Sequence, residues 1–435
     1  MAAYAAGNYA AALNEWRPLA EAGDARAQNR LGIMYGKGQG VVRDEAAAVA
    51  WYRKAAEQGD AEAENNLGFR YDHGIGVSHD RQKAWDWYQR SANQGFAGAQ
   101  YNMGVIYRDG MIVPINYKLA VDWFCKAADQ GNVDAVYNLG VMYNRGQVAA
   151  IDQPRIVGLL AKTAIAGDDG AEYQLGLLYR YGRGLGQDDA VAKSWFEKAA
   201  SKSNAGAEFQ LGLMYLKGEG VKRDVGLAAD YYRNAAVQGH VAAQVNLALM
   251  YFNGMIEEGR GVSQDYEQAS HWFKKAADQG DADGEFNLGW IHEQALGVPL
   301  DYVEAATWYT KAARQGHAQA QYNLGLLYDA GRGMVQDHKM AANWYQKAAD
   351  QGIAPAQINL GVLYANGYGV KADKVFAYIL WRLAANAGIE LANDNLRDLD
   401  GKLTAAQLHE AEDTIASWEP GTHLARRPQS RTRQE

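Results

Sequence analysis

Cysteine and proline are scarce in this 435-residue chain, which contains one cysteine and seven prolines. A single cysteine, Cys125, can form neither an intramolecular disulfide nor a cysteine-based metal site. It falls within a predicted helix, where we expect a buried and unreactive thiol. No window of 18 apolar residues is present, so we expect no membrane span.

Recognisable catalytic motifs are also missing. The nine histidines form no His-Glu-x-x-His motif, because His292-Glu293 lacks the second histidine, and no Gly-Lys-Ser/Thr phosphate loop occurs. The glycine-rich stretch 182–186 follows a predicted helix rather than a strand, which is the wrong context for a dinucleotide-binding loop. We therefore predict that the chain is not an enzyme and that it holds no cofactor and no metal.

The charge balance is acidic. The formal net charge is −8, and residues 420–435 carry four arginines and one glutamate, so the rest of the chain is near −11 (−8 minus +3). Proteins that bind nucleic acid need a basic track along the phosphates. The sequence therefore argues against a nucleic-acid partner.

Glycine, in contrast, is abundant and recurs at regular intervals. Successive copies of a Leu-Gly pair (Met-Gly once) are 36 residues apart, except for one interval of 41 that holds an insertion around residues 254–258. A fixed period of this kind marks an array of stacked repeats, here ten. The repeated position is occupied by Gly32, Gly68, Gly104, Gly140, Gly176, Gly212, Ala248, Gly289, Gly325 and Gly361.

Each repeat contains two predicted helices. In the first, called helix A, the apolar residues recur at i, i+4 and i+8 and share one face. The glycine beside them costs about 1 kcal/mol in a helix, so we expect it to allow close approach of the paired helix. The second, helix B, begins after an aspartate such as Asp44 or Asp152, which are good N-caps, and ends at a glycine such as Gly59. We predict no strands.

The end of the chain departs from the repeats, which are predicted to fill residues 1–400 and to begin with half a repeat. Thr404 and Gln407 have the spacing of a capping box. They predict a helix within residues 401–419 that covers the last repeat. Residues 420–435 are rich in Arg, Gln and Ser and are predicted to be a disordered basic tail.

The repeat motif resembles a known family. The pattern Ala-x-x-x-Leu-Gly-x-x-Tyr-x-x-Gly-x-Gly-Val-x-x-Asp, then Ala-x-x-Trp-Tyr-x-Lys-Ala-Ala-x-x-Gly, is similar to the Sel-one-like repeat (SLR), a variant of the tetratricopeptide fold. The resemblance implies an all-α, right-handed superhelical α/α solenoid of helix-turn-helix repeats. It also implies an adaptor that binds a protein or peptide along a concave surface, in bacteria often within the cell envelope, in signalling or in host interaction.

The cellular location is left open by the sequence. Residues 1–22 lack the basic start and apolar core of a signal peptide. Because the chain opens inside a repeat, a targeting segment removed before Met1 would make the protein periplasmic or secreted, which we favour. Otherwise we expect a cytoplasmic protein.

The A helices line the inner curve of a tetratricopeptide-like stack. Just before each Leu-Gly pair they carry aromatic and amide side chains, and an amide ladder offers donors and acceptors to the backbone of an extended peptide. The alternative is that these side chains only bridge adjacent A helices. The candidate binding residues are Tyr101, Asn102, Tyr137, Asn138, Tyr173, Gln174 and Phe209.

Two consecutive loops lose their glycines and become apolar. We expect them to lie side by side as one exposed rim, which favours a partner or self-association; the alternative is that they fold back onto their own helices. The helix B that follows, residues 154–165, lacks the usual aromatic pair. The residues of this apolar rim are Met111, Ile112, Val113, Ile115, Val148 and Ile151.

The sequence therefore predicts a non-catalytic scaffold that binds a protein or peptide of unknown identity through the inner curve and the apolar rim. One alternative is a cell-envelope module that stacks the sugar rings of a glycan on Tyr101, Tyr137 and Tyr173. Another is the regulatory arm of a larger protein whose catalytic part precedes Met1.

Overall fold

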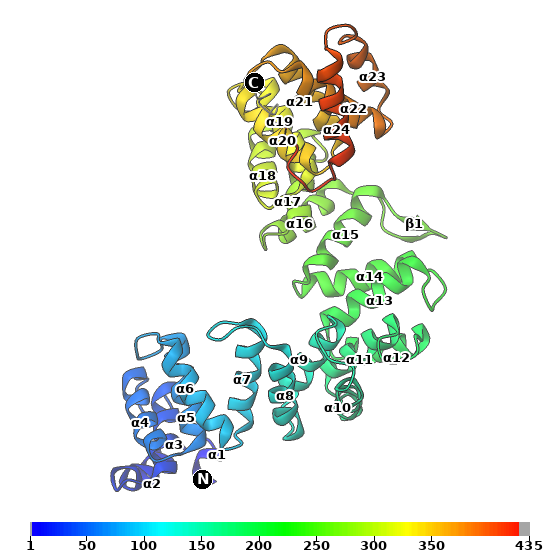
Figure 1. The fold of residues 1–435 in the computed structure, drawn as a ribbon. Helices are drawn as coiled ribbons and strands as arrows, with labels where there is room; N and C mark the ends of the chain where they lie inside the picture. Colours follow the sequence, from blue (N-terminus) through cyan, green and yellow to red (C-terminus); the bar gives the residue numbers. More distant parts are fainter. Residues whose placement is uncertain (1, 426–435) are drawn as a thin grey trace, which may run out of the picture. The chain divides into compact units, whose positions relative to one another are not determined.

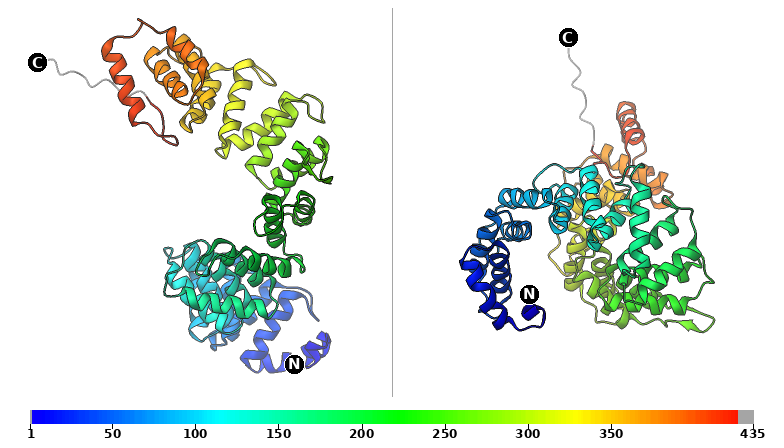
Figure 2. Two further views of the ribbon diagram at one scale, coloured as in Figure 1. Left: turned by 90° about the vertical axis from the view of Figure 1, so that its right-hand side faces the viewer. Right: turned by 90° about the horizontal axis from the view of Figure 1, so that it is seen from below.

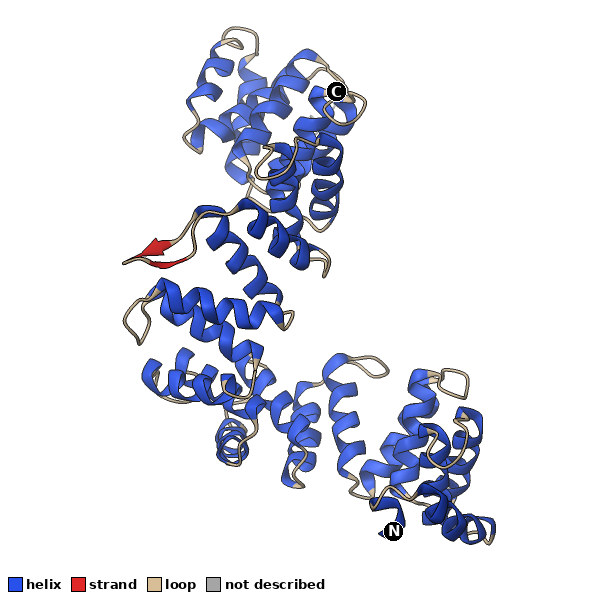
Figure 3. Ribbon diagram, turned by 180° about the vertical axis from the view of Figure 1, so that it is seen from behind, coloured by secondary structure: helices blue, strands red, loops and turns tan. Residues whose placement is uncertain are grey.

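The computed structural model describes residues 2–425, which are almost entirely α-helical (Figure 3). Helix A and helix B of each repeat pack together, and each pair is followed by the next (Figure 1, Figure 2). The chain divides into two compact units, one up to residue 207 with residues 219–221, and one of residues 208–218 with the chain from residue 222 onward. The predicted all-α solenoid of helix-turn-helix repeats is confirmed.

The first unit begins with an incomplete repeat, α1 (Ala2–Ala5) and α2 (Tyr9–Glu21). Its complete repeats alternate A and B helices. The A helices are α3 (Ala25–Lys37), α5 (Ala61–His73), α7 (Ala97–Asp109), α9 (Val133–Asn144) and α11 (Asp169–Tyr181). The B helices are α4 (Glu45–Glu57), α6 (Arg81–Asn93), α8 (Tyr117–Asp129), α10 (Gln153–Ile165) and α12 (Asp189–Ala200).

Helix α13 (Ala205–Lys217) begins in the first unit and continues in the second. The other A helices of the second unit are α15 (Val241–Asn253), α17 (Ala282–Glu293), α19 (Ala318–Ala330) and α21 (Ala354–Asn366). Its B helices are α14 (Val225–Val237), α16 (Tyr266–Ala277), α18 (Tyr302–Arg314), α20 (His338–Asp350) and α22 (Lys374–Asn386). The chain then adds α23 (Glu390–Arg397) and α24 (Ala405–Ser417).

The B helices have the predicted side-chain caps, an aspartate in most of them and Asn116 in α8, with one exception. The Oδ1 atom of Asp44 accepts a hydrogen bond from the backbone N–H of Ala47 at 2.9 Å. The prediction is wrong at Asp152, whose backbone is already helical (φ −90°, ψ −16°) and whose side chain makes no capping bond. Its own N–H instead closes a turn onto the carbonyl of Ala149 at 3.0 Å.

The repeated Leu-Gly glycine allows the paired helices to approach closely, as expected. A Cβ atom on Gly32 would lie 2.6 Å from the ring of Tyr52 on the paired B helix, and one on Gly325 would lie 2.6 Å from the ring of Tyr345. These rings are buried in the core between the A and B helices. An alanine at such a position therefore requires the ring to move.

The insertion forms a small strand pair that the sequence did not predict. β1 (Ile256–Glu257) and β2 (Arg260–Gly261) are antiparallel and lie against α14 (Figure 3). An ion pair of 3.0 Å joins Arg223 to Glu257. The expectation of no strands is wrong here, because two residues per strand are too few to show the alternation that reveals a strand.

The C-terminal helix is present and begins with the predicted capping box, in which Thr404 and Gln407 cap each other's backbone. Residues 420–425, expected to belong to a disordered tail, instead dock on α20. Leu424 is buried, and its backbone N–H donates to the Oδ1 atom of Asp350 at 2.9 Å. Because residues 420–435 are mostly polar, their composition did not indicate that Leu424 would be buried. The remainder of the predicted tail, residues 426–435, lies outside the described residues.

Candidate partner-binding surfaces

The first candidate surface is the A-helix face, defined as the residues three before, two before and one after each Leu-Gly glycine. The aromatic residues of this face pack against the aromatic ring of their own helix B. Ring centroids are 5.8 Å apart for Tyr101 and Phe124, and 6.0 Å apart for Tyr173 and Phe196. Phe209 packs in the same way on Tyr232. These rings are half-buried.

Tyr137 differs from the other aromatic residues of the face. Its helix B, α10, offers Leu160 in place of an aromatic ring. Like Tyr173 beside Gly206, Tyr137 reaches toward the next A helix, where a Cβ on Gly170 would lie 3.1 Å from its ring. The side chain is 41% exposed. It is therefore an accessible aromatic ring on a rigid helix.

The amides of the face connect neighbouring A helices. Asn102 donates a hydrogen bond to Asn65 at 2.9 Å, and Asn138 accepts one from Arg108. Gln174 is only 2% exposed and accepts a hydrogen bond from Asn144 at 2.9 Å. The expectation that Gln174 is open to a ligand is therefore wrong, because its neighbour on α9 covers and pairs it.

This face also carries a series of apolar residues that was not predicted from the sequence. The residue after each Leu-Gly position is apolar in all ten repeats, and each of these side chains is half-buried or exposed although it lies on a core helix. The series can be found in the sequence from the same 36-residue period, at the position after each Leu-Gly glycine. The series consists of Ile33, Phe69, Val105, Val141, Leu177, Leu213, Leu249, Trp290, Leu326 and Val362.

A cavity of about 330 Å³ lies on this face between α3 and α5. Ile33 and Phe69 supply its apolar lining and Asn66 an amide. The ring of Phe69 stacks on His73 with 4.1 Å between centroids. Apolar side chains beside an amide suit a peptide, which has both apolar side chains and a polar backbone.

The second candidate surface is the apolar rim, and only part of it is exposed. Met111, Ile115 and Ile151 are 40%, 55% and 87% exposed. Val148 is 8% exposed and belongs to the core, so the expectation that it lies on an open rim is wrong. Ile112 and Val113 are half-buried against the core as well.

The loop backbone explains why the rim folds inward. Ile112 and Val148 occupy the position at which other loops have a glycine with positive φ, such as Gly76 (φ 70°). Neither Ile112 nor Val148 has positive φ, a conformation that costs branched side chains too much. Ile112 and Val148 therefore differ in φ from the glycine that they replace, and both side chains pack toward the core.

Buried carboxylates are the strongest electrostatic signal in the structure. Glu64, Glu172, Glu208 and Glu285 are buried, and burial raises the pKa of Glu64, Glu208 and Glu285. Raised pKa values often mark catalytic sites. Here all four residues occupy a position that holds glutamine in other repeats, for example Gln321, which bonds to Gln351 at 2.8 Å. These carboxylates are therefore part of the repeat architecture.

The described residues show neither a cluster of metal ligands nor a reactive thiol. Residues 2–425 contain no group of three or more His, Cys, Asp or Glu side chains placed to hold a metal ion. Burial raises the pKa of Cys125 to about 11, so its thiol stays protonated at neutral pH. Within the same range no helix has the length and apolar character needed to cross a bilayer.

The architecture defines the chain as an α-solenoid built from helix hairpins, a class of repeat protein. The Sel1 repeat profile matches it ten times, and the chain belongs to the Sel1 repeat family. The fourth match stops at residue 155, so most of the degenerate helix α10 lies outside it. The matches cover residues 25–60, 61–96, 97–132, 133–155, 170–204, 205–240, 241–281, 282–317, 318–353 and 354–389.

A solved structure supports the same assignment. The chain is 36% identical to c5321, a protective antigen of uropathogenic Escherichia coli with an SLR fold; the match covers 93% of this chain and 85% of that one, with a TM-score of 0.59. It is 33% identical to a Sel1 repeat protein from Oxalobacter formigenes, over 80% and 89% of the two chains, with a TM-score of 0.47. No curated protein matches.

Proposed function

We propose that this protein is a non-catalytic interaction scaffold, which binds a protein or peptide partner through the A-helix face. The observation that carries this proposal is the apolar side chain after each Leu-Gly position, half-buried or exposed in all ten repeats. Four of these side chains, Ile33, Val105, Leu326 and Val362, pack against the core, yet each keeps part of its apolar surface in contact with water. A partner that covers the series would remove this apolar surface from water.

The neighbouring side chains suit the same partner. Tyr137 offers an accessible aromatic ring, and aromatic anchors dominate the affinity of many interfaces. Asn102 and Asn138 lie one position further along and retain polar atoms that a peptide backbone can use. Tyr101, Tyr173 and Phe209 contribute the exposed parts of half-buried rings. Met111, Ile115 and Ile151 extend the proposed contact onto the loops.

The test first identifies the partner and then measures its affinity for this chain. Affinity capture from the native host with cross-linking identifies a partner, which is then purified and titrated by calorimetry. Val141→Asp together with Leu177→Asp places two charges on the A-helix face. We expect binding to weaken at least about tenfold, because a buried unpaired charge is costly at an interface.

The matched control is Val237→Asp together with Val335→Asp, which adds the same charge at two exposed apolar positions away from this face. Circular dichroism checks the fold of both variants. Equal affinities for the two variants would show that the A-helix face is not the binding surface. Tyr137→Ala, a milder change at an exposed side chain, gives a second reading that does not depend on a buried charge.

One observation favours a second candidate function. The exposed ring of Tyr137 also suits the stacking of a sugar ring, as in a glycan-binding module. Titration with soluble cell-wall glycan fragments, followed by intrinsic fluorescence, tests this function. A response that disappears in Tyr137→Ala would support it, and no response at millimolar glycan would remove it.

A further inference from the structure

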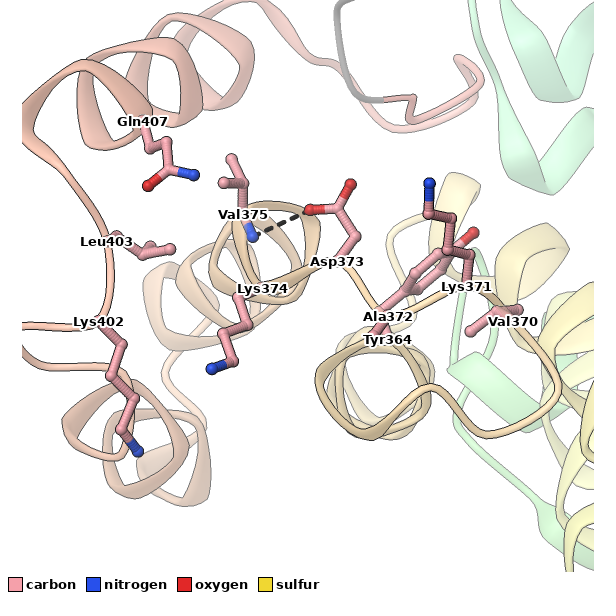
Figure 4. Close-up of a pocket in the computed structure, with 10 residues that line it drawn as sticks. All are labelled: Tyr364, Val370, Lys371, Ala372, Asp373, Lys374, Val375, Lys402, Leu403 and Gln407. Atoms are coloured by element: carbon pink, nitrogen blue, oxygen red, sulfur yellow. Dashed lines mark hydrogen bonds between the residues drawn. The ribbon is translucent and has the colours of Figure 1, made fainter.

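A cavity on the second unit lies where the repeats end, outside the A-helix face. Its volume is about 720 Å³, and it opens between the loop that precedes α22 and the N-terminus of α24 (Figure 4). Tyr364 and Val370 form one side, and Leu403 and Gln407 the other. Three lysines also line it: Lys371, Lys374 and Lys402.

The location of the cavity follows from the repeat pattern. In the regular repeats of this unit, the loop of the next repeat rests on the first residue of the preceding helix B. A Cβ on Gly297 would lie 2.8 Å from Cβ of Tyr266, and one on Gly369 would collide with the backbone of His338. The equivalent residue of the last regular helix B is Lys374, and within residues 390–425 the chain departs from the repeat pattern. The cavity therefore occupies the place of a missing loop.

Most of the charged side chains around the cavity are cationic. The ammonium groups of Lys371, Lys374 and Lys402 form no ion pair with any described residue. Asp373 is the one acid among the described lining residues, and its Oδ1 atom accepts the N–H groups of Val375 and Phe376 at 3.0 Å. A positive patch of this kind contrasts with the net charge of −8 of the whole chain.

We propose that this cavity binds an acidic peptide segment of a partner protein, which takes the place of the missing loop. The lysines attract its carboxylates, since complementary charge steers and orients association. Val370, Leu403 and the ring of Tyr364 would accept an apolar side chain next to these carboxylates. The cavity is compact and has only three cationic groups, which suits a short acidic segment better than the long phosphate track of a nucleic acid.

The experiment measures peptide binding to the full chain by fluorescence anisotropy. The probe is a labelled peptide with the sequence Glu-Gly-Glu-Gly-Leu-Asp. The control is the same peptide with glutamine in place of glutamate and asparagine in place of aspartate. We expect the acidic probe to bind, with an affinity that falls as salt rises, since exposed charge pairs are screened. We expect no binding of the neutral peptide.

Lys374→Glu with Lys402→Glu should weaken binding of the acidic probe about tenfold or more, because two attractive charges become repulsive. Lys374→Gln with Lys402→Gln should give a smaller loss. The control, Lys162→Glu with Lys339→Glu, changes the net charge equally at exposed lysines elsewhere and should leave binding within about twofold.

Four results would overturn the proposal. The first is equal binding of the acidic and neutral peptides, and the second is equal weakening by the site and control variants. The third is a single-stranded oligonucleotide that displaces the acidic probe at a lower concentration than unlabelled peptide, which would assign the lysines to nucleic acid. No binding up to roughly 1 mM peptide would also contradict it. The outcome does not depend on whether the A-helix face binds its own partner.

Discussion

Two repeats of the same length show what the motif residues do. In the repeat of α19 and α20, the glycine Gly325 rests on Tyr345, Asp337 caps α20, and Gln321 bonds to Gln351. The repeat of α9 and α10 lacks all three features. Leu160 lies below Gly140, Asp152 makes no capping bond, and the glutamine positions hold Val136 and Ala166.

The degenerate repeat still folds as a helix pair, because its core is filled in another way. Val148 enters the core from the loop and packs near Leu160. The cost falls on the A-helix face, where Tyr137 loses the aromatic neighbour that Tyr322 finds in Tyr345 and becomes exposed. Relaxed packing in one repeat thus creates an accessible aromatic ring for a partner.

The largest expected effect on stability comes from removing the Tyr345 ring, which fills the core of the regular repeat of α19 and α20. Tyr345→Ala should lower the free energy of unfolding by about 4 kcal/mol, since a fully buried aromatic side chain leaves a cavity. Leu160→Ala should cost less, about 3 kcal/mol, because a smaller side chain is removed. Urea unfolding followed by circular dichroism measures both. A larger loss for Leu160→Ala would contradict the comparison.

Adding a methyl group tests the close approach itself. Gly325→Ala should destabilise by about 2 kcal/mol, because the new Cβ would lie 2.6 Å from the rigid ring of Tyr345. Gly158→Ala in α10 should instead stabilise by up to about 1 kcal/mol, since no atom lies within 4 Å of its new Cβ and alanine favours a helix over glycine. Thermal unfolding compares the two. Equal losses would mean that the ring is not what limits the approach.

Glu285 and Glu172 occupy equivalent buried positions, but their replacement by glutamine should change stability in opposite directions. Burial raises the pKa of Glu285, and the hydrogen bond from Gln315 and the charge of Lys311 offset this only in part. A carboxyl with a raised folded pKa loses stability as pH rises from its unfolded pKa through its folded pKa. Glu285→Gln should therefore stabilise by about 1 kcal/mol at pH 8, with a gain that shrinks toward pH 4.

Glu172 serves as the matched comparison, because its partner is Lys202 at 2.7 Å rather than a glutamine. Glu172→Gln leaves Lys202 without its ion pair and should destabilise by about 1 kcal/mol at pH 8. Urea midpoints at several pH values check the pair. The account of this position fails if both substitutions change stability in the same direction.

The smallest effect concerns a helix end. Ser203 has φ 63° at the position where other repeats have glycine, including Gly239 with φ 89°. Ser203→Gly should stabilise by about 1 kcal/mol, because glycine adopts this conformation without a Cβ penalty. Gly239→Ser should cost about the same, since no atom lies within 4 Å of the added Cβ and only backbone strain is introduced. Differential scanning calorimetry resolves shifts of this size.

The regular features were predictable from the sequence because they repeat. The period, the Asp44-type caps and the close approach at Gly32 each depend on residues within one repeat, and ten copies reinforce the pattern. The capping box at Thr404 is local as well. Local signals of this kind decide helix ends and the spacing of helix pairs.

The features that escaped prediction depend on residues far apart in the chain. Gln174 is covered by Asn144, 30 residues earlier, and Leu424 docks on Asp350, 74 residues earlier. The inward turn of Val148 depends on how its loop replaces a glycine. The lysine-lined cavity exists because a repeat is missing after α22, and a missing element leaves no motif to find.

The most direct test of the central proposal is hydrogen–deuterium exchange on the full chain, with and without a purified partner. Binding through the A-helix face predicts slower exchange in α7, α9 and α11, with the strongest protection around Tyr137, and little change in α8, α10 and α12. Protection confined to these B helices, or to the loops alone, would contradict the proposal that the A-helix face is the binding surface.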